Sequence, residues 1–228
     1  MAGSNVVAAY IASKCELCQH QNMIKSTYHH GNLAPALVDA ALKLVEQGGA
    51  QAISLRDLAQ SLGVSRAAPY RHFADRDALL ATLAARGFED LVALYEAALA
   101  GPGDGPARLR AAGRAFYDFA TRRPGLYRLM FESDFLNRTA PPAVLLGPAE
   151  KSYRLLWELV AGAYPDADAT EVKVRTIIMI STAHGFLTLD QVGRFRPFMY
   201  EPLTHEEMVQ AVMQAAMGIS TKRPRAEQ

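Results

Sequence analysis

The fold of this chain is decided by the stretch Ser54-Leu-Arg-Asp-Leu-Ala-Gln-Ser-Leu-Gly-Val-Ser-Arg-Ala-Ala-Pro-Tyr-Arg-His-Phe73. Ser54 and Asp57 form a helix-start signature, because each side chain can satisfy a free amide at the beginning of a helix. Apolar residues then recur at helical spacing as far as Leu62. Gly63 is predicted to end that helix in a left-handed conformation, and Ser65 is predicted to cap a second short helix. Two short helices joined by such a turn form a helix-turn-helix.

The residue types in the second helix suit contact with DNA, since the second helix of such a unit lies in the major groove. Arg66 is the long donor at its start, and arginine paired with guanine is the commonest specific base contact. Small neighbours let the backbone approach DNA, and the polar groups that follow can reach phosphates. The alternative is an ordinary helical hairpin with solvated charges. The predicted DNA-binding residues are Ser54, Arg56, Ser65, Arg66, Ala67, Ala68, Tyr70, Arg71, His72 and Arg76.

Two runs of sequence carry a family resemblance. The run from His29-His-Gly-Asn-Leu33 to Ser65-Arg-Ala-Ala-Pro-Tyr-Arg-His-Phe-Ala-Asp-Arg-Asp-Ala-Leu-Leu80 resembles the N-terminal domain of the TetR (AcrR-like) transcriptional regulators. Arg123-Pro-Gly-Leu-Tyr-Arg-Leu-Met-Phe131 and Ala183-His-Gly185 are similar to the branch whose C-terminal domain carries a Trp-His-Gly signature. Ala183 stands where that branch has tryptophan, so a ligand role for the tryptophan does not carry over. The resemblance covers about residues 26–220.

That resemblance implies a homodimer on double-stranded DNA, with the last two helices of each subunit in a four-helix interface. Two reading helices about 34–36 Å apart would address successive major grooves of a near-palindromic operator. It also implies a small-molecule effector and, by family habit, a repressor. The predicted interface residues are Val172, Ile177, Ile180, Leu187, Val192, Met208, Val212, Met213, Ala216 and Met217.

Composition bounds the remaining possibilities. The chain has 228 residues, which is long enough for two helical domains. Half of its residues (50%) are hydrophobic, and this composition excludes wholesale disorder. The net charge of +1 argues against a protein coated in nucleic acid, although a local patch suffices for a regulator. The sequence shows neither a run of 18 apolar residues nor a signal-peptide pattern, so we expect no membrane partner. Two cysteines make no disulfide framework, which indicates a cytoplasmic protein.

The chain is predicted to be all-α, because no segment alternates with a period of two. We expect a disordered extension over residues 1–24, a helix-turn-helix DNA-binding domain over 25–75, a ligand-binding and dimerisation domain over 76–220 and a polar tail over 221–228. Cys15 and Cys18 with His20 do not supply the four ligands of a zinc site, so neither a metal nor another cofactor is expected. The helices are predicted at 33–48, 55–62, 76–99, 108–122, 124–131, 143–163, 168–192 and 205–219.

The C-terminal half concentrates aromatic residues and methionine. Any one of them is more simply explained as core, but together they suit a pocket for a small apolar or aromatic ligand. His184 is the polar group singled out, because it interrupts an apolar helical stretch; the alternative is a hydrogen-bonded core histidine. The predicted ligand-binding residues are Phe116, Tyr117, Tyr127, Phe131, Trp157 and His184.

Two other functions were weighed. An enzyme is disfavoured, because the chain has no Gly-x-Ser-x-Gly motif, and His205-Glu-Glu lacks the second histidine of a zinc protease. A ligand-responsive interaction module without specific operator binding is the second alternative. The intact run from Ser65 to His72 argues against that alternative.

Overall fold

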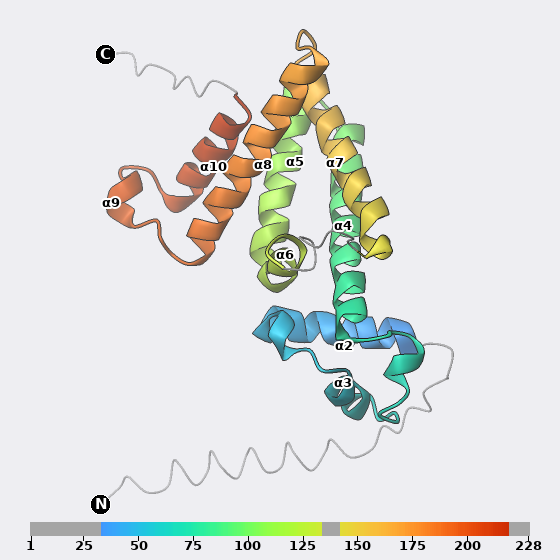
Figure 1. Ribbon diagram of the computed structural model, residues 1–228. Coiled ribbons are helices and arrows are strands. Elements are labelled where there is room, and N and C mark those ends of the chain that lie inside the picture. The colour runs from blue at the N-terminus through green and yellow to red at the C-terminus, as the bar shows by residue number, and fades with distance from the viewer. Residues whose placement is uncertain (1–32, 134–141, 219–228) are drawn as a thin grey trace, which may run out of the picture. The chain divides into compact units, whose positions relative to one another are not determined.

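The computed structural model describes residues 33–133 and 142–218, and every regular element in these ranges is a helix, which confirms the all-α prediction (Figure 1). Contacts between Cα atoms divide the chain into two units, Met1–Leu33 and Ala34–Gln228, and every described residue except Leu33 belongs to the second unit. The elements are α2 (Leu33–Gly48), η1 (Ala50–Ala52), α3 (Leu55–Ser61), η2 (Pro69–Arg71), α4 (Arg76–Ala100), α5 (Gly105–Arg122), α6 (Pro124–Phe131), α7 (Ala143–Ala163), α8 (Ala169–Gln191), α9 (Pro197–Tyr200) and α10 (His205–Ala216).

The turn after α3 has the geometry that the sequence predicts. Ser54 caps α3, with its hydroxyl oxygen accepting from the amide of Asp57 at 3.3 Å. Gly63 has a φ of 67°, and the amide of Val64 donates to the carbonyl of Ala59. These bonds, with that from the Gly63 amide to Gln60, form a Schellman motif, which satisfies the last carbonyls of the helix.

Helix α4 is the longest element of the described chain. Asp75 caps it by accepting from the Ala78 amide at 2.7 Å. Its 25 residues correspond to about 37 Å of helix. Leu79, Leu83 and Leu91 are buried along it, and it packs against α5, α6 and α7. The helix therefore runs from the end of the helix-turn-helix segment into the C-terminal bundle.

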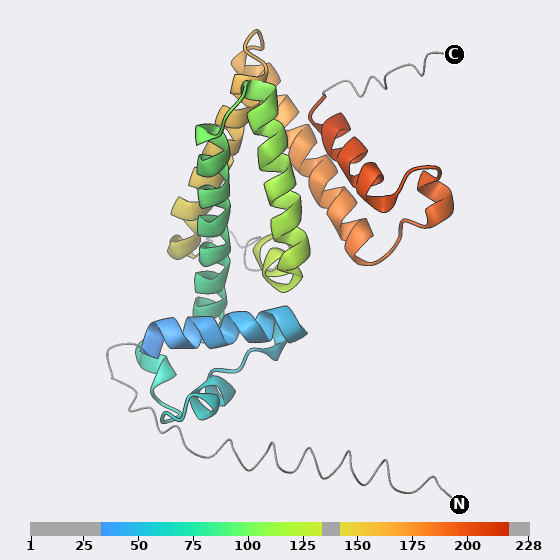
Figure 2. The ribbon, with the colours of Figure 1, turned by 180° about the vertical axis from the view of Figure 1, so that it is seen from behind.

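The C-terminal bundle is built from α4, α5, α6, α7, α8 and α10, and α5 packs against each of the other five (Figure 2). Side-chain caps begin three of these helices: Asp104 for α5, Asp168 for α8 and Thr204, within a capping box, for α10. The bounds predicted for α6 and α7 are confirmed, because proline or a proline-rich turn marks both starts.

Two predicted helix bounds are corrected, and two short helices were missed. Helix α5 begins at Gly105 rather than at residue 108, with Pro106 in its first turn. Helix α10 ends at Ala216 rather than at residue 219. Helix α9 and the short η1 were not predicted, since three or four residues are too few to show a helical period.

Half of the predicted interface residues lie in the interior of the subunit. Helix α10 packs against α8 of the same chain, so each of the two helices buries one apolar face in this contact. Because α8 is apolar on two faces, the sequence alone did not separate the inner face from the outer one. The residues buried within the subunit are Val172, Leu187, Met208, Met213 and Met217.

Candidate nucleic-acid interface and effector cavity

The recognition segment, residues 65–73, is wound more tightly than the α-helix predicted to begin at Ser65. The amide of Ala68 donates to Ser65 at 2.9 Å and that of Arg71 to Ala68 at 3.2 Å, so the bonds span three residues and regular structure is confined to η2. The reason is Pro69. It has no amide hydrogen to donate to the carbonyl of Ser65, and its ring clashes with that carbonyl in an α-helix. The prediction of a regular helix from Ser65 is therefore wrong.

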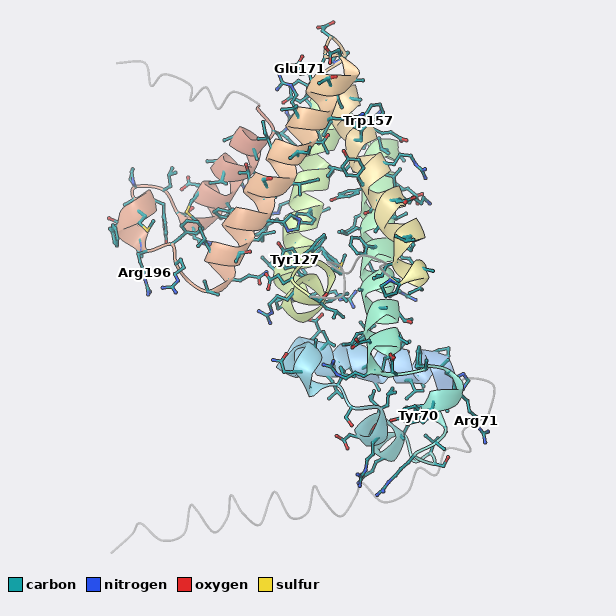
Figure 3. All side chains as sticks on the ribbon, in the orientation of Figure 1. Tyr70, Arg71, Tyr127, Trp157, Glu171 and Arg196 are labelled. Atoms are coloured by element: carbon teal, nitrogen blue, oxygen red, sulfur yellow. The ribbon has the colours of Figure 1, made fainter. Side chains whose placement is uncertain are left out.

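Most of the predicted DNA-binding side chains in this segment are exposed. Arg66, Arg71 and His72 are exposed, and Tyr70 keeps 55% of its surface. Tyr70 and Arg71 project outward from the turn between α3 and α4 (Figure 3). Pro69 and Phe73, by contrast, are buried and anchor the segment. The arrangement presents a guanidinium-rich surface on a fixed backbone, as a protein that contacts DNA phosphates and base edges requires.

Three other predicted DNA-binding residues have different surroundings. Arg56 is exposed in the first turn of α3, and Ser54 is engaged as its cap. Arg76 donates through Nε to the carbonyl of Ile53 at 3.1 Å and through Nη2 to that of Ala50 at 2.7 Å. Its guanidinium thus holds the connection between α2 and α3, a role that sequence reasoning missed.

A cavity of about 170 Å³ lies within the C-terminal bundle. Helices α4, α5, α6, α7, α8 and α10 all contribute lining residues. Three of the six predicted ligand-binding residues line it: Phe116, Phe131 and His184. Sequence reasoning missed Tyr95 and Ser152, which also line it, because each looks like an ordinary inward position of a long helix.

His184 is enclosed by aromatic rings. Its ring centroid lies 4.4 Å from that of Phe131 and 5.4 Å from that of Phe116. Its Nδ1 lies 2.5 Å from the hydroxyl oxygen of Tyr127. Burial lowers the pKa of His184 to about 4 and raises the pKa of Tyr127 above its usual range. Both groups are therefore neutral near pH 7.

The other predicted ligand-binding residues lie outside the cavity lining. Tyr127 lies on α6 (Figure 3) and is the hydrogen-bond partner of His184. The Tyr117 hydroxyl donates to Asp190 at 3.1 Å, and desolvation together with that carboxylate raises the pKa of Tyr117 to about 12. The indole nitrogen of Trp157 is buried without a partner among the described residues. Helical spacing put these rings inside the bundle, but it could not tell which of them share one cavity.

A polar joint connects α6 to α2. The carboxylate of Glu46 accepts from the amides of Gly125 at 2.9 Å and Leu126 at 3.2 Å. Arg123 approaches Glu46 at 3.7 Å and also pairs with Asp90 of α4. A Cβ on Gly125 would lie 2.7 Å from the Cα of Glu46, so the two helix ends touch. Sequence reasoning missed this joint, because its partners are about 80 residues apart.

Two absences hold for the described residues. Between 33 and 133 and between 142 and 218, no helix is both long and apolar enough to cross a membrane. Over these same ranges, no group of three or more His, Cys, Asp or Glu side chains could hold a metal ion. The expectations for Cys15, Cys18, residues 1–24 and the tail 221–228 fall outside the part of the chain that the structure describes.

Two family models match the chain. Residues 37–83 match the model described as bacterial regulatory proteins of the tetR family, and residues 109–216 match the tetracyclin repressor-like C-terminal domain. Together they cover the recognition segment and most of the residues that line the cavity. The chain belongs to the TetR family of transcriptional regulators, which bind DNA through the helix-turn-helix.

Relatives and solved structures agree with this assignment. The HTH-type transcriptional activator FasR of Mycolicibacterium smegmatis is 30% identical over 125 residues, which span 55% of this chain and 57% of that protein. The nucleoid occlusion factor SlmA of Escherichia coli is 35% identical over 119 residues, which span 50% and 60% of the two proteins. The matches thus span less than two thirds of these curated relatives.

Among solved structures, a protein of unknown function from Rhodococcus sp. RHA1 is similar at a TM-score of 0.71 with 30% identity, covering 85% of this chain and 98% of that one. The TetR-family regulator PfmR of Thermus thermophilus shares the fold at a TM-score of 0.57 with 23% identity, covering 80% and 97%.

Proposed function

We propose that this protein is a homodimeric repressor that binds a near-palindromic operator and leaves it when a small molecule enters the cavity. The observation that carries the proposal is the position of α6. One end of this helix is bound to α2 of the DNA-binding segment through Glu46, and the other end supplies Phe131 to the cavity wall.

Release would follow from that connection. A ligand that displaces Phe131 or His184 moves α6, and the amides of Gly125 and Leu126 move with it. Glu46 then either follows, which turns α2 and the recognition segment, or loses its hydrogen bonds. A ligand that prefers the displaced conformer lowers DNA affinity by its differential affinity for the two states.

Dimerisation is supported by the outer face of α8. The positions 174, 178, 181, 185, 188 and 192 follow one another at steps of four and three, and all are exposed. Val174, Ile178 and Val192 keep between 51% and 63% of their surface. Gly185 opens onto free space at the middle of this face, so a second helix can approach closely. Pairing such faces across a two-fold axis buries them.

The first experiment measures binding of the full chain to its own upstream intergenic DNA against a scrambled duplex. Fluorescence anisotropy at one near-physiological salt concentration is the readout, because phosphate-driven binding weakens steeply with salt. We expect at least ~10³-fold preference for the native duplex. If only genomic fragments from elsewhere are bound, the operator lies there; if none is bound, the operator proposal fails and an interaction module remains.

Substitutions sharpen this test. Arg66→Ala should relax specificity at one base pair by about 1–3 kcal/mol, whereas Arg71→Ala should weaken all sequences alike. Arg154→Ala removes the same charge from the exposed face of α7 and serves as the control. A reporter gene behind the operator then separates repression from activation, the activity in FasR's name.

The dimer is tested separately by light scattering during size-exclusion chromatography. Ile178→Glu places a charge on the outer face of α8, where Ile178 keeps 53% of its surface, and should give a monomer. Val144→Glu on α7, where 46% of the surface is exposed, is the matched control and should leave the mass unchanged. An unchanged mass for Ile178→Glu would contradict this interface.

A further inference from the structure

We propose that the cavity takes an uncharged molecule the size of one aromatic ring, carrying a hydrogen-bond acceptor that meets Nε2 of His184. The inference rests on the proposed role of this cavity as the effector site and adds the chemical class of the effector. Charge, size and hydrogen-bonding capacity each point to this class.

Charge comes first. The lining of the cavity contains no Asp, Glu, Lys or Arg among the described residues. Its side-chain polar atoms come from Tyr95, Ser152, Tyr153 and His184, and His184 is neutral near pH 7. An ion placed there would lose its hydration without gaining a counter-charge, which costs several kcal/mol. The surroundings therefore select a neutral ligand over a carboxylate or an ammonium ion.

Size is the second argument. The volume of about 170 Å³ is close to that of engineered apolar cavities of about 150 Å³ that bind benzene. Ring faces and edges from Phe88, Phe116, Phe131 and Tyr95 surround this space, and aromatic rings prefer such offset and edge-on partners. One aromatic ring with a short substituent matches this volume, whereas the second of two fused or linked rings would have to extend beyond it.

The hydrogen bond to Tyr127 determines the tautomer of His184, that is, which of its ring nitrogens carries the proton. Tyr127 is 1% exposed, and its hydroxyl has no partner other than Nδ1 of His184 among the described residues. If Nδ1 carried the proton, the hydroxyl hydrogen of Tyr127 would be buried without an acceptor, which is costly. The tyrosine therefore donates to Nδ1, and the histidine proton is on Nε2.

This places a donor at the cavity. Nε2 of His184 has no hydrogen-bond partner among the described residues. Among the described residues, the buried side-chain polar atoms without a partner are Trp157 Nε1 and Tyr164 Oη. Nε2 of His184 is not one of them, so this unpartnered atom is accessible. Since His184 lines the cavity, its accessible Nε2–H is available to an acceptor such as a carbonyl oxygen.

The test uses four probes of graded chemistry with the DNA-free full chain in isothermal titration calorimetry. Acetophenone has the ring and the acceptor, ethylbenzene lacks the acceptor, benzoate adds a negative charge, and 4-phenylacetophenone adds a second ring. We expect acetophenone to bind, ethylbenzene to bind about fivefold more weakly, and the other two to bind at least tenfold more weakly than acetophenone.

Two variants locate the site. Ala183→Leu fills space at the cavity wall and should abolish binding. His184→Phe keeps a ring but removes the donor, so acetophenone and ethylbenzene should then bind equally. Tyr164→Phe also removes one polar group from an aromatic ring, but outside this cavity, and should leave all four affinities unchanged. Circular dichroism establishes that each variant is folded.

Binding of benzoate as tight as that of acetophenone would overturn the inference, and so would the absence of binding by any ring-sized probe. Equal loss of all affinities in Tyr164→Phe would also overturn it. Operator binding is measured in a separate titration. If acetophenone binds as expected but leaves operator affinity unchanged, the ligand class stands and the release mechanism fails.

Discussion

The two ends of α6 have opposite chemistry. At its first turn, the amides of Gly125 and Leu126 meet the carboxylate of Glu46, with Arg123 and Asp90 beside them. At its last turn, Phe131 lies among the rings of Phe88, Phe116 and His184.

One short helix thus contacts α2 of the DNA-binding segment at one end and lines the cavity at the other. Under the proposed function, the apolar end would shift with what fills the cavity, because ring contacts weaken more gradually with displacement than hydrogen bonds do. The polar end is directional, because hydrogen bonds weaken steeply when they are misaligned. A small shift at the apolar end would then become a discrete change at the polar end.

The largest effect is expected from Gly125→Ala at the polar end. Helix propensity alone would favour alanine by about 1 kcal/mol, but the added Cβ would overlap the carbonyl of Val45 and approach the Cα of Glu46. Because backbone cannot move aside cheaply, we expect a loss of about 3 kcal/mol in the free energy of unfolding. Urea denaturation measures it.

Gly147→Ala is the matched control, since nothing lies within 4 Å of a Cβ there and the position is inside α7. It should be neutral or slightly stabilising. Equal behaviour of the two variants would mean that the ends of α2 and α6 do not touch in solution.

The second effect concerns the apolar end and its pH dependence. The pKa of His184 is about 4 in the folded protein and about 6.5 when unfolded, so acid protonates the unfolded chain first. Stability should therefore fall as the pH drops from about 6.5 towards 4, by about 2 kcal/mol at pH 5. Thermal denaturation between pH 7 and 5 measures this loss.

His184→Phe should remove this part of the pH dependence, because phenylalanine does not titrate. Other groups contribute equally in the two proteins and cancel in the comparison. A variant that loses as much stability as the parent between pH 7 and 5 would show that His184 is not the buried, neutral group described.

The third effect is expected from Glu46→Gln. The amide keeps one oxygen acceptor but loses the charge that favours the helix N-terminus and Arg123. Both side chains are about one-third exposed, so we expect a modest loss of about 1 kcal/mol in stability. The sharper readout is a weaker response of operator affinity to the ligand. Glu89→Gln, on the exposed side of α4, is the control and should change neither quantity.

The smallest effect is expected from Tyr127→Phe, which removes the hydroxyl that pairs with His184. We expect a loss of about 1 kcal/mol on denaturation. Tyr164→Phe removes a buried hydroxyl that lies beside Arg175 but makes no well-formed hydrogen bond in the described part of the chain, so it should cost less than Tyr127→Phe. A reversed order would contradict the hydrogen bond assigned to Tyr127.

Much of the fold was predictable because its signals are local. The Ser54 and Asp75 caps each depend on a side chain three residues from the amide it satisfies, and the Gly63 turn depends on backbone bonds that reach back three and five residues. The recognition segment was predicted less well. There, Pro69 decided against an α-helix, although its effect on the carbonyl four residues earlier follows from its chemistry.

The candidate sites divide in the same way. The resemblance and the residue types identified the exposed recognition segment, including Tyr70 and Arg71. For the cavity, the aromatic composition predicted that a pocket exists. It did not predict that Trp157 would lie outside the lining or that Tyr95 would belong to it.

By itself, the sequence determined the all-α fold, the helix-turn-helix and the surplus of aromatic residues in the C-terminal half. Periodicity and capping act over one or two turns, so they can be read along the chain. Only the tertiary structure decided which face of α8 is outside, which rings enclose His184, and that Glu46 binds the start of α6. These relations join residues tens of positions apart, and they depend on how whole helices pack, which no local pattern specifies.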